Sequence, residues 1–243
     1  MLSLQGKRNS NQDRVLVVHP DNGGKLLAAV ADGLGGMFAG DKAAEIAMET
    51  LTESADDLLA AMSGNFADAC GSLIDAYQRA NDRIRAYAEE HGKPGGVGTT
   101  LTTWIVSGSR YLCVNIGDSR CYTVNAVVHQ VTRDHSVADE LLSQGVLSAA
   151  DYSTSPLRHQ LTKSLGAKTL SDPDVFPATR FGEIVPGEIF LLCSDGFYTK
   201  LIDEDIEDLT ISSDLDATLK ELATEALARG TSDNLSAVVI RTD

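Results

Sequence analysis

Five aspartates stand at the ends of apolar runs that are typical of β-strands. Asp32, Asp118 and Asp195 directly follow such runs and stand beside a glycine, whereas Asp13 and Asp233 precede such runs. In antiparallel sheets the end of one strand lies beside the start of its neighbour, so all five carboxylates can converge at one edge. Clustered carboxylates repel one another unless a cation neutralises them. Oxygen ligands without a set of His or Cys residues favour Mg²⁺ or Mn²⁺ over Zn²⁺.

A single Asp-Gly pair has a simpler explanation, because this dipeptide is common in turns. The metal hypothesis therefore depends on the five positions together. Each carboxylate borders a nearly uncharged strand, where water is partly excluded and an unpaired acidic group is costly. We interpret the set as a metal site rather than as five independent turns.

The elements that must position these aspartates occur in blocks. Runs rich in β-branched and aromatic residues predict strands, which span residues 15–18, 25–31, 101–107, 110–116, 120–124, 127–131, 189–193 and 235–241. Apolar residues spaced by three and four predict helices, which span about 44–59, 66–87, 136–144 and 215–228. The first two strands should form a hairpin across a turn at 19–24, and the four between 99 and 131 a meander. Because strands and helices follow one another in blocks rather than in strict alternation, we expect an α+β fold with antiparallel sheets covered by helices.

Composition excludes several classes of protein. Among 243 residues, 35 acidic side chains outnumber 20 basic ones, for a formal net charge of −15, which argues against nucleic-acid binding. Every apolar run is far shorter than the roughly 20 residues that cross a bilayer, and the N-terminus has no apolar stretch typical of a secretory signal. Four cysteines without CxxC spacing are typical of buried, reduced thiols. We expect a cytoplasmic protein that contacts no membrane.

Eight short motifs, in order, resemble those of the metal-dependent protein phosphatases of the PP2C type, also called the PPM family. Arg8 to Asp13 resembles its RxxNxD opening, Asp32 to Gly36 its DGxGG turn and Gly98 to Thr100 its GTT segment. Five later segments are similar to its remaining motifs: GDSR at 117–120, TxDHS at 132–136, LTRALG at 161–166, SDG at 194–196 and DNxS at 233–236. Each motif alone is weak evidence, but eight in order along nearly the whole chain are specific. The form of the motifs resembles the stand-alone prokaryotic members.

This resemblance implies a four-layer α-β-β-α sandwich, with two antiparallel sheets flanked by helices, as one phosphatase domain over residues 1–243. It also implies hydrolysis of phosphoserine and phosphothreonine in proteins. A water or hydroxide that bridges two divalent ions, Mg²⁺ or Mn²⁺, would attack phosphorus. The expected partner is a phosphoprotein substrate of a Ser/Thr protein kinase, and we expect a monomer.

The resemblance also implies roles for the aspartates. Asp32 should bridge the two ions and the backbone carbonyl of Gly33 should bind one of them. Asp195 and Asp233 should bind the other ion, with Asp13 close by as a ligand or through a bound water. The planar guanidinium of Arg8 matches the family's phosphate-binding arginine, which can hold two phosphate oxygens at once.

A third, weaker ion is implied where Asp118 and Asp195 match the family's pattern. The irregular segment at about 143–160 corresponds to the flap beside the active site of the bacterial enzymes. Some members carry a histidine after the first Asp-Gly or after the paired glycines, but Leu34 and Met37 stand there in this chain. His159 is the one nearby candidate for a proton donor, although a loop histidine is more often simply solvated.

Two alternatives stay open at this point. The chain could be a non-catalytic member of the fold that binds a partner, but all five aspartates are present, which argues against that hypothesis. It could also hydrolyse another phosphoester, such as a nucleotide or a nucleic acid. The net charge of −15 and the lack of a Lys or Arg cluster argue against a polymer substrate.

Overall fold

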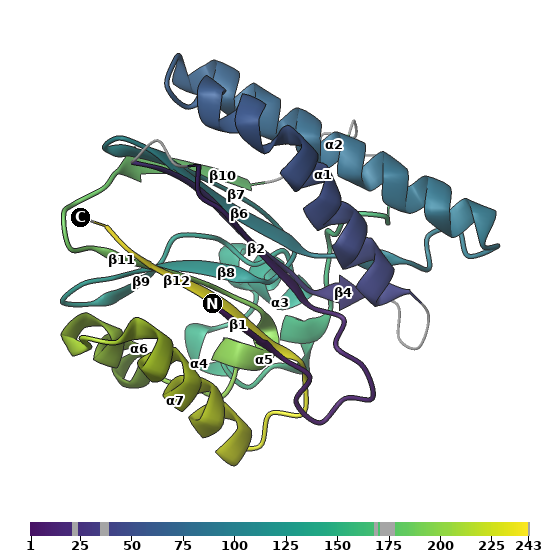
Figure 1. The fold of residues 1–243 in the computed structure, drawn as a ribbon. Coiled ribbons are helices and arrows are strands. Elements are labelled where there is room, and N and C mark those ends of the chain that lie inside the picture. Colours follow the sequence, from purple (N-terminus) through teal and green to yellow (C-terminus); the bar gives the residue numbers. More distant parts are fainter. Residues whose placement is uncertain (21–23, 35–38, 168–169, 171–177, 243) are drawn as a thin grey trace.

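Two five-stranded antiparallel sheets pack face to face, and a pair of long helices covers each outer face (Figure 1). The computed structural model describes residues 1–20, 24–34, 39–167, 170 and 178–242. The middle of the predicted turn at 19–24, and the positions of Gly35, Gly36 and Met37, lie outside the described residues. The predicted four-layer α+β sandwich is confirmed, because helices, sheet, sheet and helices follow one another through the molecule.

The first sheet has the strand order β10-β7-β6-β3-β2. Its strands are β2 (Arg14–Val18), β3 (Lys25–Ala31), β6 (Leu101–Ser107), β7 (Arg110–Ile116) and β10 (Ala178–Glu183). Its outer face is covered by α1 (Gly40–Ala61) and α2 (Phe66–Glu90). The predicted hairpin is confirmed, since β2 pairs with β3 and Arg14 lies opposite Ala31. Asn65 is the N-cap of α2, because its Oδ1 accepts a hydrogen bond from the Ala67 N–H at 2.9 Å.

The second sheet has the order β1-β12-β11-β8-β9. Its strands are β1 (Leu2–Leu4), β8 (Arg120–Val124), β9 (Val128–Gln130), β11 (Ile189–Cys193) and β12 (Leu235–Arg241). The helices on its outer face are α6 (Asp203–Ile211) and α7 (Leu215–Ala228). Three short elements, β4 (Gly33–Leu34), β5 (Gly98–Thr99) and α5 (Asp195–Tyr198), lie beside predicted site residues. Among the described helices, none combines the length and apolar content that a bilayer crossing requires.

Burial on both faces of the inner strands explains their nearly continuous apolar sequences. In β3, Leu27 and Ala29 pack under the helices of the first sheet, whereas Ala28 and Val30 face the second sheet. Alternate residues of a strand point to opposite faces, so a strand between two apolar layers needs apolar residues at every position. Cys113, Cys121 and Cys193 are buried and unpaired as predicted, but Cys70 on α2 is only half-buried.

The predicted meander between residues 99 and 131 is wrong. β6 pairs with β7 in the first sheet and β8 pairs with β9 in the second, so the chain crosses between the sheets after Ile116. Gly117 makes the crossing possible: its φ is +104°, and a Cβ there would lie 2.5 Å from a methyl carbon of Thr100. Because two hairpins in different sheets have the same local pattern as one meander, the sequence did not distinguish them.

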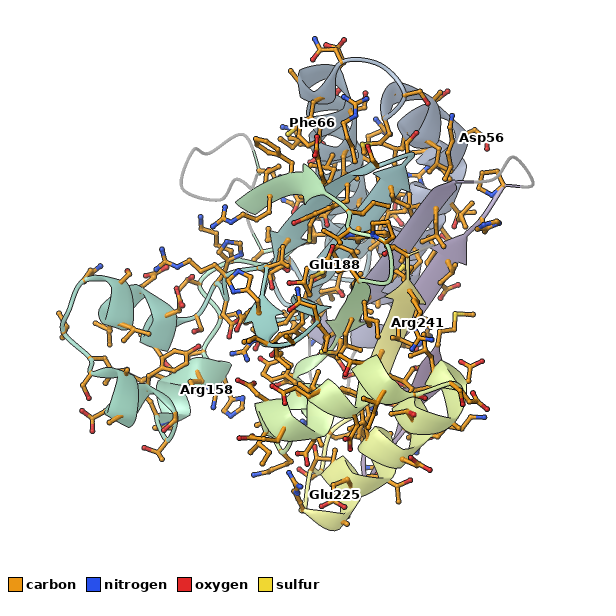
Figure 2. The ribbon with its side chains drawn as sticks, turned by 90° about the vertical axis from the view of Figure 1, so that its left-hand side faces the viewer. Asp56, Phe66, Arg158, Glu188, Glu225 and Arg241 are labelled. Atoms are coloured by element: carbon orange, nitrogen blue, oxygen red, sulfur yellow. The ribbon has the colours of Figure 1, made fainter. Side chains whose placement is uncertain are left out.

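The segment at 143–160 is more regular than predicted. After α3 (Val137–Ser143) it contains α4 (Ala149–Tyr152) and a 3-10 turn at Pro156–His159. Their N-caps are Ser148, which accepts from the Asp151 N–H, and Ser155, which accepts from the Leu157 N–H. These serine caps were the available sequence signal. Figure 2 shows the segment projecting to one side of the molecule, with Arg158 labelled.

Candidate metal centre

The five predicted aspartates lie together at one edge of the sandwich. The pairing of Arg14 with Ala31 brings Asp13, just before β2, beside Asp32, just after β3. In the second sheet, Cys193 lies opposite Ala237, so Asp195 follows β11 near the start of β12, where Asp233 precedes the strand. A hydrogen bond joins the two sheets at this edge, because Ser194 Oγ donates to Asp13 Oδ2 at 2.7 Å.

Two carboxylate oxygens of this cluster are buried without a donor. Asp13 is 1% exposed, and its Oδ1 has no hydrogen-bond partner among the described residues. The same is true of Asp195 Oδ1. Burial raises the pKa of Asp13 to about 7, although the hydrogen bond from Ser194 works in the other direction. An acidic oxygen that is buried and unpaired is costly, so this donor-poor arrangement fits a cation.

Mutual repulsion adds to the effect of burial. The pKa of Asp32 is raised well above its ordinary value by burial and then by the neighbouring charge of Asp13. The pKa of Asp118 is raised to about 8 by burial and then by Asp195. Each carboxylate therefore disfavours ionisation of the others, and a divalent ion would reverse that effect.

The spread of the carboxylates indicates which ion fits. Among the described residues, no trio of Asp, Glu, His or Cys side chains encloses a single ion. A structural Zn²⁺ site needs such a closed set of side chains. The donors of the cluster are carboxylate oxygens, which are the ligands that Mg²⁺ and Mn²⁺ prefer.

Close packing and backbone hydrogen bonds fix Asp32 and Gly33. The Asp32 N–H donates to Thr100 Oγ1 at 2.9 Å, and the Asp32 carbonyl accepts from the Thr100 N–H at 2.9 Å. At Gly33 a Cβ would lie 2.2 Å from the carbonyl oxygen of Gly40, where α1 begins. A side chain at Gly33 would therefore push α1 away from this edge.

Arg8 lies at the exposed rim of the cluster. Its Nη2 is 2.7 Å from Asp233 Oδ2, and its side chain is 57% exposed. The hydrogen bond with Asp233 raises the pKa of Arg8 further above its ordinary value. The other oxygen of Asp233 accepts from the Asn234 N–H at 2.9 Å. The predicted phosphate-binding group thus stands beside a predicted metal ligand while remaining accessible.

A cleft of about 250 Å³ opens at this edge between the 3-10 turn and the second sheet. Its lining includes His159, Lys200, Asp195 and Asp233. His159 Nδ1 lies 3.5 Å from Asp195 Oδ2, and this contact raises the pKa of His159. The His159 side chain is 56% exposed, so it is a solvated loop residue, as expected, that also contacts the cluster. Lys200 was missed, because no sequence motif marks it.

His135 joins its own turn to the sheet crossing by two hydrogen bonds. Its Nδ1 accepts a hydrogen bond from the Gly117 N–H at 3.1 Å, and its own N–H donates to the Gly117 carbonyl at 2.9 Å. Burial lowers the pKa of His135 to about 4, so the ring is neutral and acts as an acceptor at neutral pH. The two hydrogen bonds brace the sheet crossing that precedes Asp118.

A buried ion pair that the sequence did not reveal attaches the 143–160 segment to the site. Arg120 donates from Nε and Nη2 to the two oxygens of Asp134, at 2.9 and 2.7 Å. Tyr152 of α4 donates to Asp134 Oδ2 at 3.3 Å. The Arg120 guanidinium lies 3.9 Å over the ring of Tyr198, whose hydroxyl donates to the Asp118 carbonyl at 3.1 Å. These contacts form one continuous chain from α4 to Asp118.

Comparison with known proteins gives one consistent result. The family model "Protein phosphatase 2C" matches residues 3–239. Serine/threonine phosphatase stp of Listeria monocytogenes is 31% identical over 99% of this chain and 96% of its own length. Serine/threonine protein phosphatase PstP of Mycobacterium tuberculosis is 31% identical over 96% of this chain, which spans 42% of that protein.

Solved structures agree in fold. The crystal structure of the Mycobacterium tuberculosis serine/threonine phosphatase PstP/Ppp has a TM-score of 0.87 at 29% identity, with 100% of this chain and 97% of that chain covered. The catalytic domain of PstP in complex with two manganese ions has a TM-score of 0.80 at 28% identity, with 100% and 96% covered.

Proposed function

This chain belongs to the protein phosphatase 2C family, and we propose that its five clustered aspartates hold the divalent ions on which its activity depends. It is a metal-dependent protein serine/threonine phosphatase of the prokaryotic type, which hydrolyses phosphoserine and phosphothreonine in proteins. The observation that carries the site assignment is the convergence of five carboxylates from both sheets, two of them with a buried oxygen that lacks a donor.

The assignment gives each residue a position around the ions. Asp32, at the centre of the cluster, would contact both ions, and the Gly33 carbonyl would bind one of them. Asp195 and Asp233 would bind the second ion, with Asp13 held nearby by Ser194. A third, weaker ion would lie between Asp118 and Asp195, whose charges already act on each other. The ions are Mg²⁺ or Mn²⁺, which share these ligands.

The protein's own groups bind and orient the phosphoryl group. When bound, the ions supply Lewis acids that lower the pKa of water and offset charge on phosphoryl oxygens. Arg8 can turn its exposed guanidinium from Asp233 toward two phosphate oxygens, because its planar fork matches their spacing. Leu34 supplies no proton after the first Asp-Gly. The cleft between His159 and Asp233 is where the phosphorylated side chain would enter.

The biological setting extends the same proposal. Residues 1–243 would act as one phosphatase domain whose flap at 143–160 borders the entrance. The substrate would be a phosphoprotein made by a Ser/Thr protein kinase of the same cell, and the enzyme would act as a monomer in the cytoplasm. Four unpaired cysteines support a reducing compartment.

Phosphate release from a phosphothreonine peptide tests the metal assignment. Release should require Mn²⁺ or Mg²⁺ and stop with a chelator. Asp195→Asn should lower kcat/KM by about 100-fold or more, because a catalytic ion contributes several kcal/mol to transition-state stabilisation. Calorimetric titration with Mn²⁺ should show the corresponding loss of binding. The exposed Asp56 of α1 offers a matched control, Asp56→Asn. Full turnover and unchanged Mn²⁺ binding by Asp195→Asn would refute the assignment.

Arg8 is tested separately. Arg8→Ala should raise KM for a small phosphoester more than it lowers kcat, because the side chain binds phosphate in the ground state as well. Arg85→Ala, on α2, removes a guanidinium that pairs with Glu89 on the same helix, and it serves as the control. An unchanged KM for Arg8→Ala would remove Arg8 from the phosphate site.

A further inference from the structure

The cleft beside the predicted metal centre contains a lysine that the assignment of the ions does not use. Asp195 and Asp233, which are predicted metal ligands, line this cleft of about 250 Å³ together with Lys200. Lys200 is exposed and forms no ion pair with any carboxylate of the described residues. Its ammonium is therefore available to an anionic group of a bound substrate.

The short helix α5 places Lys200 and Asp195 on the same wall of the cleft. Asp195 begins α5, and Lys200 comes two residues after its last residue, Tyr198. The Thr199 N–H donates to the Asp195 carbonyl at 3.0 Å, so the helical turn continues beyond Tyr198, and Thr199 lines the cleft as well. A helix rises about 1.5 Å per residue, so the five steps from Asp195 to Lys200 span about 8 Å.

Hydrogen bonds fix the backbone of Lys200 but leave its side chain free. Arg229 Nη1 donates to the Lys200 carbonyl at 3.1 Å. The guanidinium of Arg229 is itself held by Asp205, whose Oδ1 accepts from Nη2 at 2.9 Å, and by Glu225. Arg229 therefore uses its charge within the fold, whereas the charge of Lys200 is presented at the cleft.

The other basic groups at this edge already contact the aspartates. His159, which also lines the cleft, lies beside Asp195, and Arg8 at the rim lies beside Asp233. Lys200 has no such contact. The groups next to the ions and Lys200 can therefore act on different parts of one substrate: the former on the phosphoryl group, and Lys200 on a neighbouring residue of the peptide.

The length of the wall indicates which substrate residue Lys200 reaches. This inference rests on the proposed function, which places the phosphorylated side chain at Asp195 and Asp233. An extended peptide advances about 3.3 Å per residue. The span of about 8 Å between Asp195 and Lys200 therefore corresponds to two or three peptide residues.

We propose that Lys200 selects phosphorylation sites that have an acidic residue two or three positions from the phosphoserine or phosphothreonine. The Lys200 ammonium donates a charge-assisted hydrogen bond to the carboxylate of that substrate residue. Because the cleft is open to water, the pair is partly screened. Exposed ion pairs of this kind change an equilibrium by up to about fivefold, which sets the size of the expected preference.

Pairs of phosphothreonine peptides test the proposal in the presence of Mn²⁺. One peptide of each pair carries a single Glu at the second or third position before or after the phosphothreonine, and the other carries Gln there. The readout is the ratio of kcat/KM for the Glu peptide to kcat/KM for the Gln peptide, from phosphate release. We expect a ratio of about three to five on one side of the phosphothreonine. Glu at the sixth position, about 20 Å away, should give a ratio near one.

Variants assign the preference to Lys200. Lys200→Gln should lower the ratio to about one, because the cation is gone. Lys200→Glu should reverse the preference, so that a peptide with Lys at the selected position becomes a better substrate than the Glu peptide. Lys220→Gln, on the exposed surface of α7, removes the same charge elsewhere and should keep the ratio of the parent. A merely structural role of Lys200 would change all peptides alike and would not reverse the preference.

Two outcomes would overturn the proposal. One is a ratio near one at all four positions in the parent enzyme, and the other is a preference for Glu that Lys200→Gln leaves unchanged. Either result would leave the phosphatase assignment intact, because phosphate is still released. A parent enzyme that releases no phosphate from any peptide would instead refute the proposed function, and this inference with it.

Discussion

The aspartate cluster predicts that the metal-free protein loses stability as the pH rises from 5 to 7. The pKa of Asp13 in the folded protein is about 7 and that of Asp118 about 8, both raised from 3.8 chiefly by burial. In this range the folded chain keeps protons that the unfolded chain has lost. The free energy of unfolding therefore falls as the pH rises from the unfolded pKa toward the folded pKa.

The size of the effect follows from the two groups. Each carboxyl releases one proton more in the unfolded chain than in the folded chain, so Asp13 and Asp118 together lower the free energy of unfolding by about 3 kcal/mol between pH 5 and 6. For a protein of this size 1 kcal/mol shifts Tm by about 2–4 °C, so Tm should fall by roughly 5–10 °C per pH unit. The raised pKa of Asp32 acts in the same direction. Divalent ions bind the deprotonated carboxylates, so saturating Mn²⁺ should remove this loss.

Thermal unfolding followed by circular dichroism measures this effect, with chelator or with Mn²⁺ at pH 5, 6 and 7. Asp118→Asn should melt at a higher temperature than the parent at pH 7 with chelator, because a buried Asn is neutral without a proton, whereas the Asp118 carboxyl must take one up on folding. General repulsion in a chain of net charge −15 also weakens the fold at higher pH. Asp56→Asn, exposed on α1, reports that contribution alone. A chelated parent protein whose Tm stays constant or rises from pH 5 to 7 would refute the reasoning.

Two further predictions concern stability. Arg120→Met leaves Asp134 buried without its cationic partner and should lower the free energy of unfolding in urea by about 3–5 kcal/mol. The double variant Arg120→Met with Asp134→Leu should recover much of that loss. An Arg120→Met variant as stable as the parent would contradict a stabilising role for the buried pair. Asn65→Ala removes the N-cap of α2 and should cost about 1 kcal/mol; the same unfolding curves check this, and no change in the midpoint would show that the cap contributes nothing.

Local patterns in the sequence were sufficient for most of the elements, and they indicated that five aspartates lie at strand ends. The predicted bounds are confirmed for the strands at 25–31, 189–193 and 235–241 and for the helix at 215–228. Strands buried on both faces are continuously apolar, whereas apolar residues recur every three to four positions along a helix with one buried face. The predicted strand boundaries also placed each of the five aspartates next to the end or the start of a strand. Weaker signals were missed: β10 (Ala178–Glu183) is an edge strand without an apolar run, and α6 (Asp203–Ile211) begins with three acidic residues.

Contacts between segments that are distant in the sequence decided how the strands pair and which side chains meet at the site. The sequence showed that residues 101–131 form strands, but only the tertiary structure assigned them to two sheets, and this assignment brings Asp118 to the edge where the other four aspartates lie. The contact of His159 with Asp195 and the ion pair of Arg120 with Asp134 likewise join segments that have no common local pattern. An apolar residue indicates that its face is buried, but the partner that buries it is selected by packing across the whole chain, for which the local sequence carries no signal.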